Sequence, residues 1–194
     1  LVHVLYGRTG GLKAMNNQIW QQNGNDLLDD RERDDHFGAA LAAGDFNADG
    51  YVDLAIGVPG DRVGQIDEAG SVTILFGGAA RLSAAGSQYL HQNTQGVLDK
   101  CHEDDAFGGS LAVGDFNRDG RLDLAAANGV LVSVGLGDGA GACAALVSIP
   151  VGSAGDFANT VAVTDFDRDG IADLVVAVNG NAGRLALLLG RGDG

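Results

Sequence analysis

Short apolar segments bounded by glycine recur along the chain and alternate with acidic turns. Segments of this kind are typical of β-strands that are covered on both faces, so the pattern predicts an all-β chain. We expect one strand before each acidic turn and one after it. The strands before the turns are Ala39–Phe46, Ser110–Phe116 and Thr160–Phe166, and the strands after them are Val52–Val58, Leu122–Ala127 and Ala172–Val178.

Each predicted pair continues into further strands. The third strands are Ser71–Phe76, Val130–Val134 and Arg184–Leu189, and more polar fourth strands are expected at Ser87–Gln92 and Ala144–Ile149. Four antiparallel strands with the polar one outermost form one blade of a β-propeller. Near the N-terminus, Val2–Tyr6 resembles a third strand and Gln18–Gln22 a fourth.

The order of these strands predicts one propeller domain with four parts. They are the second half of a blade (1–35), a blade (36–100), a second blade (101–152) and a partial blade (153–194). Closed propellers typically have about four to eight blades. We therefore expect a partial propeller of about three blades, which does not close a ring by itself.

The acidic turns share the pattern Asp-x-[Asn/Asp]-x-Asp-Gly-x-x-Asp and begin at residues 45, 115 and 165. Oxygens at positions 1, 3 and 5 converge when such a loop wraps a cation, glycine at position 6 permits the turn, and positions 7 and 9 add a backbone carbonyl and a carboxylate. Ligands that are all hard oxygens favour Ca²⁺ over zinc or copper. The predicted ligands of about three Ca²⁺ ions are Asp45, Asn47, Asp49, the Tyr51 carbonyl and Asp53; Asp115, Asn117, Asp119, the Arg121 carbonyl and Asp123; and Asp165, Asp167, Asp169, the Ile171 carbonyl and Asp173.

Two other interpretations of these loops agree less well with the sequence. Asp, Asn and Gly are good turn formers, but a turn does not require four oxygens at fixed alternation in three copies. An EF-hand shares the first six positions but needs a glutamate at position 12 and flanking helices. Position 12 is Ile56, Ala126 or Val176 here, and the flanks are predicted strands, which excludes the EF-hand.

Net charge and composition disfavour some classes of binding partner. The formal net charge is −14, which disfavours binding to nucleic acid or to an anionic membrane surface. No apolar run is long enough for a membrane span. The absence of an initiator methionine and of a signal-peptide pattern leads us to expect a processed, trimmed or partly observed polypeptide. Cys101 and Cys143 leave open one disulfide or two free thiols.

The motifs around the loops resemble the FG-GAP repeat of integrin α-subunits and of calcium-binding FG-GAP and VCBS-type bacterial proteins. Phe37-Gly38, the acidic loop and Gly57-Val58-Pro59 carry the resemblance. The second repeat keeps Phe107-Gly108 but has Ala127-Asn128-Gly129, and the third has only Phe157. The resemblance implies that the calcium loops lie on one propeller face. It also implies that partners dock on the opposite face, around Pro59–Gly70 and the segments before Phe37 and Phe107.

From these features we expect a non-catalytic calcium-binding scaffold, secreted or at the cell surface, that recognises a protein or glycan ligand in adhesion. Two alternatives remain open. One is a structural subunit that self-assembles through its open blade edges, or is completed by the remainder of a longer chain. The other is a non-catalytic module of a larger secreted hydrolase. We interpret Arg191-Gly192-Asp193 as a strand turn, and His102 with its acidic neighbours as a solvated loop.

Overall fold

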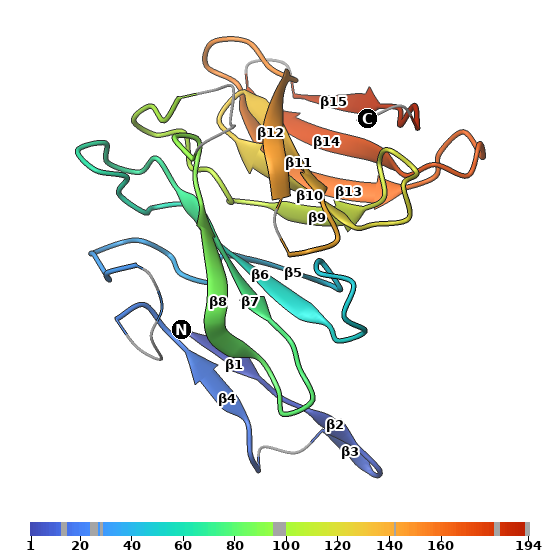
Figure 1. Ribbon diagram of the computed structural model, residues 1–194. Coiled ribbons are helices and arrows are strands. Elements are labelled where there is room, and N and C mark those ends of the chain that lie inside the picture. The colour runs from blue at the N-terminus through green and yellow to red at the C-terminus, as the bar shows by residue number, and fades with distance from the viewer. Residues whose placement is uncertain are drawn as a thin grey trace.

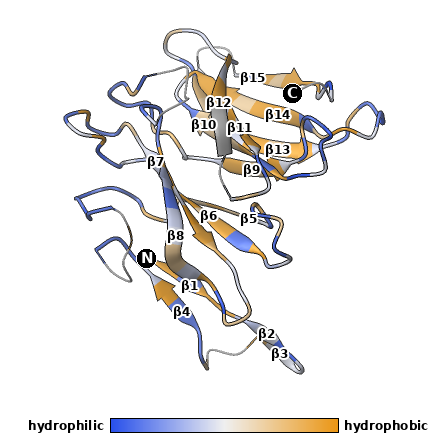
Figure 2. Cartoon of the chain, viewed as in Figure 1, coloured by the Kyte–Doolittle hydropathy of each residue, from blue (hydrophilic) through white to orange (hydrophobic). Residues whose placement is uncertain are grey.

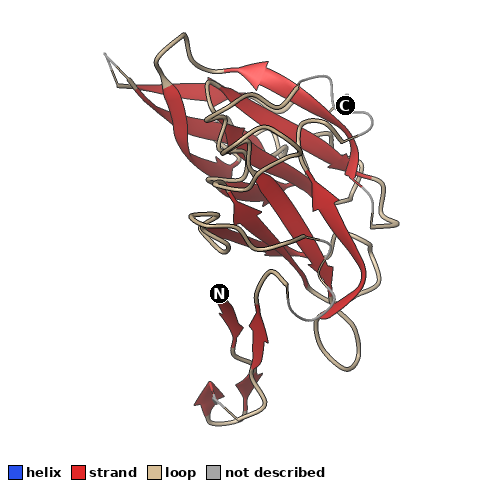
Figure 3. Cartoon of the chain, turned by 90° about the vertical axis from the view of Figure 1, so that its left-hand side faces the viewer, coloured by secondary structure: helices blue, strands red, loops and turns tan. Residues whose placement is uncertain are grey.

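The computed structural model describes residues 1–12, 15–23, 27, 29–94, 100–141, 143–180 and 183–192, without the side chains of residues 143–145. Every regular element in these ranges is a strand (Figure 3). Within these ranges the chain has no helix that could cross a membrane. The all-β prediction is therefore confirmed.

Two four-stranded antiparallel sheets form the centre of the molecule, in the spatial orders β5-β6-β7-β8 and β9-β10-β11-β12. A three-stranded sheet, β13-β14-β15, follows them, and β1 pairs with β4 near the N-terminus. The strands are β1 (Val2–Val4), β4 (Gln18–Trp20), β5 (Ala40–Gly44), β6 (Asp53–Val58), β7 (Ser71–Phe76), β8 (Ser83–Leu90), β9 (Leu111–Gly114), β10 (Asp123–Asn128), β11 (Leu131–Gly137), β12 (Cys143–Pro150), β13 (Phe157–Thr164), β14 (Asp173–Asn179) and β15 (Arg184–Leu188).

The sheets follow one another through space in chain order (Figure 1). Three apolar clusters fill the spaces between successive sheets. Trp20 packs with Ile56 between the first two sheets, Ile74 with Leu124 between the next two, and Val132 with Val176 between the last two. Antiparallel four-stranded sheets stacked in this way, with a core between each pair, are blades of a β-propeller.

Burial separates the inner strands from the outermost one. Every residue of β10 is buried, and β6 is buried at all positions but one, as expected for strands covered on both faces. The edge strand β8 is mostly exposed or half-buried. Figure 2 shows the same contrast, with apolar colour along β6 and β14 and paler or hydrophilic colour along β8. The predicted polar outer strand is confirmed for this sheet.

The predicted strand ends differ from the observed ones where a backbone amide donates to a side-chain carboxylate and not to the neighbouring strand. The first strands were expected to run to Phe46 and Phe116, but β5 and β9 end at Gly44 and Gly114. The reason is that the amide of Phe46 donates to a carboxylate of the acidic loop and not to a neighbouring strand. Near the N-terminus a small hairpin, β2 (Gly7–Arg8) and β3 (Gly11–Leu12), was not predicted.

The Phe-Gly pair of the second repeat is a point of close contact between sheets. Phe107 is almost fully buried, and Gly108 lies against Gly57 of the preceding sheet so closely that a Cβ on Gly57 would overlap the Gly108 carbonyl. In the third repeat Ala158 replaces this glycine, and Phe157 is 53% exposed. The third Phe is thus equivalent in sequence but not in packing.

Cys101 is a buried free thiol. The side chain of Cys143 lies outside the described residues, as does Asp193 of the Arg191-Gly192-Asp193 turn.

Candidate metal centre

The three acidic loops are the β5–β6, β9–β10 and β13–β14 connections, so they lie at the same end of three successive sheets. Position 4 has a positive φ in each loop (56° at Ala48, 59° at Arg118 and 67° at Arg168), and so does the glycine at position 6. Glycine occupies this left-handed region without steric cost, which explains its place in the motif.

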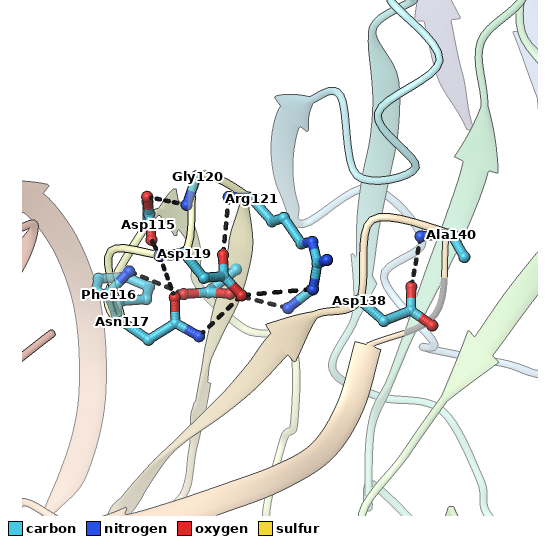
Figure 4. Close-up of polar contacts among 10 residues, drawn as sticks. Asp115, Phe116, Asn117, Asp119, Gly120, Arg121, Asp138 and Ala140 are labelled. Atoms are coloured by element: carbon cyan, nitrogen blue, oxygen red, sulfur yellow. Dashed lines mark hydrogen bonds and ion pairs between the residues drawn. The ribbon is translucent and has the colours of Figure 1, made fainter. Parts of the chain in front are cut away.

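Within the second loop, the side chains at positions 1, 3 and 5 turn inward around the backbone (Figure 4). The amide of Asp119 donates to Asp115 Oδ1 and to Asn117 Oδ1 at 3.1 and 3.0 Å. The amide of Gly120 donates to Asp115 Oδ2, and that of Arg121 to Asp119 Oδ1, both at 2.9 Å. These bonds hold the oxygens of alternate positions on one side of the loop.

The same network recurs in the other two loops. Asp49 N donates to Asp45 Oδ1 and to Asn47 Oδ1, both at 3.1 Å. Asp169 N donates to Asp165 Oδ1 and to Asp167 Oδ1, again at 3.1 Å. Residue 7 of each loop contributes its amide to the position-5 carboxylate, at 2.8 Å for Tyr51 and for Ile171. Coordination by the carbonyls of residue 7 stays a prediction.

The position-9 aspartates, Asp53, Asp123 and Asp173, are fully buried and also join strands. Asp173 Oδ2 accepts from Phe166 N at 2.7 Å, and its Oδ1 accepts from Gly190 N at 2.9 Å. The other two make equivalent pairs of bonds. Each therefore links the start of its loop to the end of the third strand, a role that the sequence did not reveal.

The glycine that ends each third strand is the partner that sequence reasoning missed. A Cβ on Gly77, Gly137 or Gly190 would overlap the carbonyl oxygen of the residue that precedes the position-9 aspartate. Only glycine lets the backbone approach closely enough to donate to the buried carboxylate. The recurrence of a glycine at this point in all three repeats was the available signal.

The third loop provides the strongest test of fit for a cation. Carboxylate oxygens of Asp165, Asp167 and Asp173 lie within 4.8 Å of one another. A Ca²⁺ shell with ligand distances of about 2.3–2.6 Å spans about 5 Å, so these oxygens fit around one ion. The donor set, carboxylates with no nitrogen or sulfur, also suits calcium. In the first two loops an amide at Asn47 or Asn117 replaces one of these carboxylates.

The electrostatics of the loops follow from burial and crowding. Burial raises the pKa of Asp53 and of Asp123, against the opposing effect of their backbone hydrogen bonds. Loss of hydration, with repulsion from Asp169, Asp173 and Asp165, raises the pKa of Asp167. In the second loop, Arg121 lies 3.7 Å from Asp119 and offsets part of its charge. The side chains are therefore placed so that a cation would relieve their mutual repulsion.

A second acidic group lies outside these loops and was not singled out in the sequence. It comprises Asp29, Glu32 and Asp61, whose carboxylate oxygens also lie within 4.8 Å of one another. Burial raises the pKa of Asp29 to about 7, with further contributions from Asp61 and Glu32.

Comparison with known proteins agrees with these repeats. The FG-GAP repeat matches residues 37–75, and the FG-GAP-like repeat matches residues 115–176. The chain is 38% identical over 88 residues to phosphatidylinositol-glycan-specific phospholipase D of Rattus norvegicus (45% of this chain, 10% of the relative). The protein of the same name from Mus musculus is 33% identical over 125 residues (63% of this chain, 14% of the relative).

The chain thus spans only about a tenth of the length of these curated relatives. The two repeat matches together cover about half of the chain, and they fall on the sheets that carry the acidic loops. With the stacked antiparallel sheets, they show that the chain belongs to the FG-GAP repeat β-propeller proteins.

Proposed function

We propose that this chain is a calcium-stabilised, non-catalytic part of an extracellular or cell-surface β-propeller, with Ca²⁺ bound in each of its three acidic loops. The carrying observation is the convergence of the Asp165, Asp167 and Asp173 carboxylates within 4.8 Å, in a loop whose hydrogen-bond network recurs in the other two. The blade boundaries 1–35, 36–100, 101–152 and 153–194 belong to the same proposal.

We infer an extracellular location from the kind of calcium site that these loops resemble. Sites in extracellular modules bind calcium with dissociation constants of about 10⁻⁴–10⁻³ M, and so they fill only where calcium is abundant. The third loop has four carboxylates and no amide, whereas the second has an amide and a competing arginine. Since affinity rises with ligand charge, we expect the third loop to bind most tightly.

Calcium titration calorimetry with melting curves tests this proposal. We expect about one ion per loop and a fall in melting temperature when EDTA is added, because an ion bound only by the folded state stabilises it by about 2.7 kcal/mol at a hundredfold excess over Kd. Asp167→Asn and Asp169→Asn should weaken the third site selectively. Unchanged melting in excess EDTA, with no heat of binding, would contradict the proposal.

The relatives favour a particular setting for this scaffold. They are named as phospholipases D specific for phosphatidylinositol-glycan, and the matched region is a small part of each. We therefore favour a non-catalytic module of a larger hydrolase, in which the propeller contacts a protein or glycan near the substrate. Fusion of this chain to a catalytic domain should change KM for a glycosylphosphatidylinositol substrate and leave kcat unchanged. Turnover of that substrate by this chain alone would argue against the assignment.

A further inference from the structure

Four carboxylates gather at the end of β5 and β6 that lies opposite the first acidic loop. Asp29, Glu32 and Asp35 precede β5, and Asp61 follows β6. Since β5 and β6 are antiparallel and joined by the acidic loop at one end, the start of β5 and the end of β6 share the other end. The amide of Gly60 donates to the carbonyl of Asp35 at 3.0 Å, which fixes the two connections together.

Three of these four carboxylates accept a hydrogen bond from the protein at one oxygen. Asp29 Oδ2 accepts from Gln22 at 2.7 Å, and Asp61 Oδ2 accepts from the Tyr89 hydroxyl at 2.6 Å. Asp35 Oδ2 accepts from the Glu32 amide at 2.6 Å. The other oxygens of Asp35 and Asp61 accept no hydrogen bond of good geometry, although the two residues are only 3% and 0% exposed. Beside Asp61 lie the Ser71 hydroxyl and the Asp29 carboxyl group.

An orphaned carboxylate oxygen is costly in a buried position, because the oxygen loses water and gains nothing in exchange. Two such oxygens beside two further carboxylates are more costly still, since like charges repel in a medium of low polarity. Native proteins resolve this arrangement by pairing the acids with a cation, by protonating them or by coordinating a metal.

The other two repeats have an aspartate at the position equivalent to Asp35, and there it has a basic partner. Asp105 and Asp156 occupy the same turn as Asp35, because each accepts at Oδ2 from the amide three residues earlier. Asp156 also pairs with Arg184 at 3.0 Å, and Asp105 lies 3.4 Å from His102 Nδ1. Among the described residues of these three turns, only Asp35 has a buried carboxylate oxygen without a hydrogen-bond partner.

Protein cations do not supply the missing charge in the part of the chain that the structure describes. Arg62 pairs with Asp67 at 2.5 Å and acts on Glu32 only at longer range, and Arg33 lies 3.5 Å from Asp34. Within the described ranges, Arg31 lines the same cavity as Glu32 and Asp35 but forms no ion pair with them. Among the described residues, no ion pair links a lysine or arginine to Asp29, Glu32, Asp35 or Asp61.

We propose that Asp29, Glu32 and Asp61 hold an additional Ca²⁺ ion, separate from the repeat loops, with Asp35 adding negative charge at the same end of the sheet. The ligands would be carboxylate oxygens, which calcium prefers, and the three oxygens within 4.8 Å of one another fit a calcium shell of about 5 Å. An open cavity of about 460 Å³, lined in part by Glu32 and Asp35 together with Arg31, lies beside the group and leaves Glu32 accessible from solvent. The bound ion would tie the connection before β5 to the connection after β6.

Equilibrium dialysis with Ca²⁺ on the whole chain tests this site. Glu32→Gln is the main variant, because Glu32 is exposed and its loss leaves the core unchanged. It should weaken one class of bound ion by about tenfold or more, because calcium affinity depends on ligand charge. Asp61→Asn should abolish the same class while Tyr89 keeps an oxygen to donate to, and circular dichroism in EDTA would verify that this variant is folded.

Asp34→Asn is the matched control, since it removes one charge from the same connection at an exposed side chain. It should bind as many ions as the wild type, with the same affinity. Asp169→Asn, in the third repeat loop, should lower the affinity of a different bound ion. The experiment therefore distinguishes loss of the proposed additional site from loss of a repeat-loop site. If Glu32→Gln and Asp61→Asn both bind calcium as the wild type does, the cluster holds protons and the inference is wrong.

Discussion

At the scale of single residues, the buried and the exposed aspartates of an acidic loop have different roles. Asp173 is buried and satisfied by two backbone amides, whereas Asp167 is exposed and matches an asparagine in the other loops. Asp173→Asn should therefore destabilise the fold by about 1–3 kcal/mol even in EDTA, because one amide would face another donor. Asp167→Asn should cost little there. Urea denaturation of both variants in EDTA checks this, and equal stabilities would contradict it.

His91 gives a residue-scale expectation for pH. Burial lowers its pKa below the ordinary 6.5, in spite of Asp61, and its Nδ1 accepts from the Asn93 amide at 3.1 Å. A depressed pKa stabilises the fold above the unfolded value, and this contribution is lost as the pH falls below 6.5. His91→Gln should thus lose less stability than the wild type between pH 7 and pH 5. Denaturation curves at both pH values test this, and identical losses would exclude it.

At the scale of elements, the end of each third strand depends on close backbone approach. A Cβ on Gly137 would overlap the Leu122 carbonyl and displace the amide that donates to Asp123 at 2.9 Å. Gly137→Ala should destabilise the chain by about 1–3 kcal/mol, as overpacking commonly does. Gly7→Ala, where nothing lies within 4 Å, is the matched control and should be nearly neutral. Thermal melts of both variants test this prediction. If Gly137→Ala melts at the same temperature as the wild type, the strand end can move to accommodate the added methyl group and the prediction is wrong.

At the scale of the whole molecule, the stack of sheets leaves an apolar face on its last sheet. Leu185 and Leu187 of β15 are 74% and 51% exposed, and Leu189 beyond it is 50% exposed. Exposed leucines of this kind favour association with a second copy, as in the self-assembly alternative. We expect concentration-dependent association in sedimentation, reduced by Leu185→Glu with Leu187→Glu. If the chain is monomeric at all concentrations, the self-assembly alternative is wrong, and the exposed leucines would then be available to pack against a further blade.

The sequence by itself determined the strand pattern, the three repeats and the residues of the acidic loops. These are local properties: burial on both faces selects short apolar segments, and a loop that presents oxygens at alternate positions needs its acids and glycine at fixed spacing. Most predicted strands were confirmed to within a few residues, and Ser71–Phe76 in full. The ends were misplaced where Phe46 and its counterparts donate to a side chain, a choice that strand propensity does not encode.

Only the tertiary structure decided which distant residues meet. It gave Asp53, Asp123 and Asp173 their second role as links to Gly77, Gly137 and Gly190. It also gathered Asp29 and Glu32 with Asp61, because the connections before β5 and after β6 share one end of an antiparallel pair. The turn of Asp35 recurs at Asp105 and Asp156, but nothing in the linear pattern places Asp61 beside Asp29 and Glu32. Their proximity arises from sheet topology, which depends on long-range packing and not on local pattern.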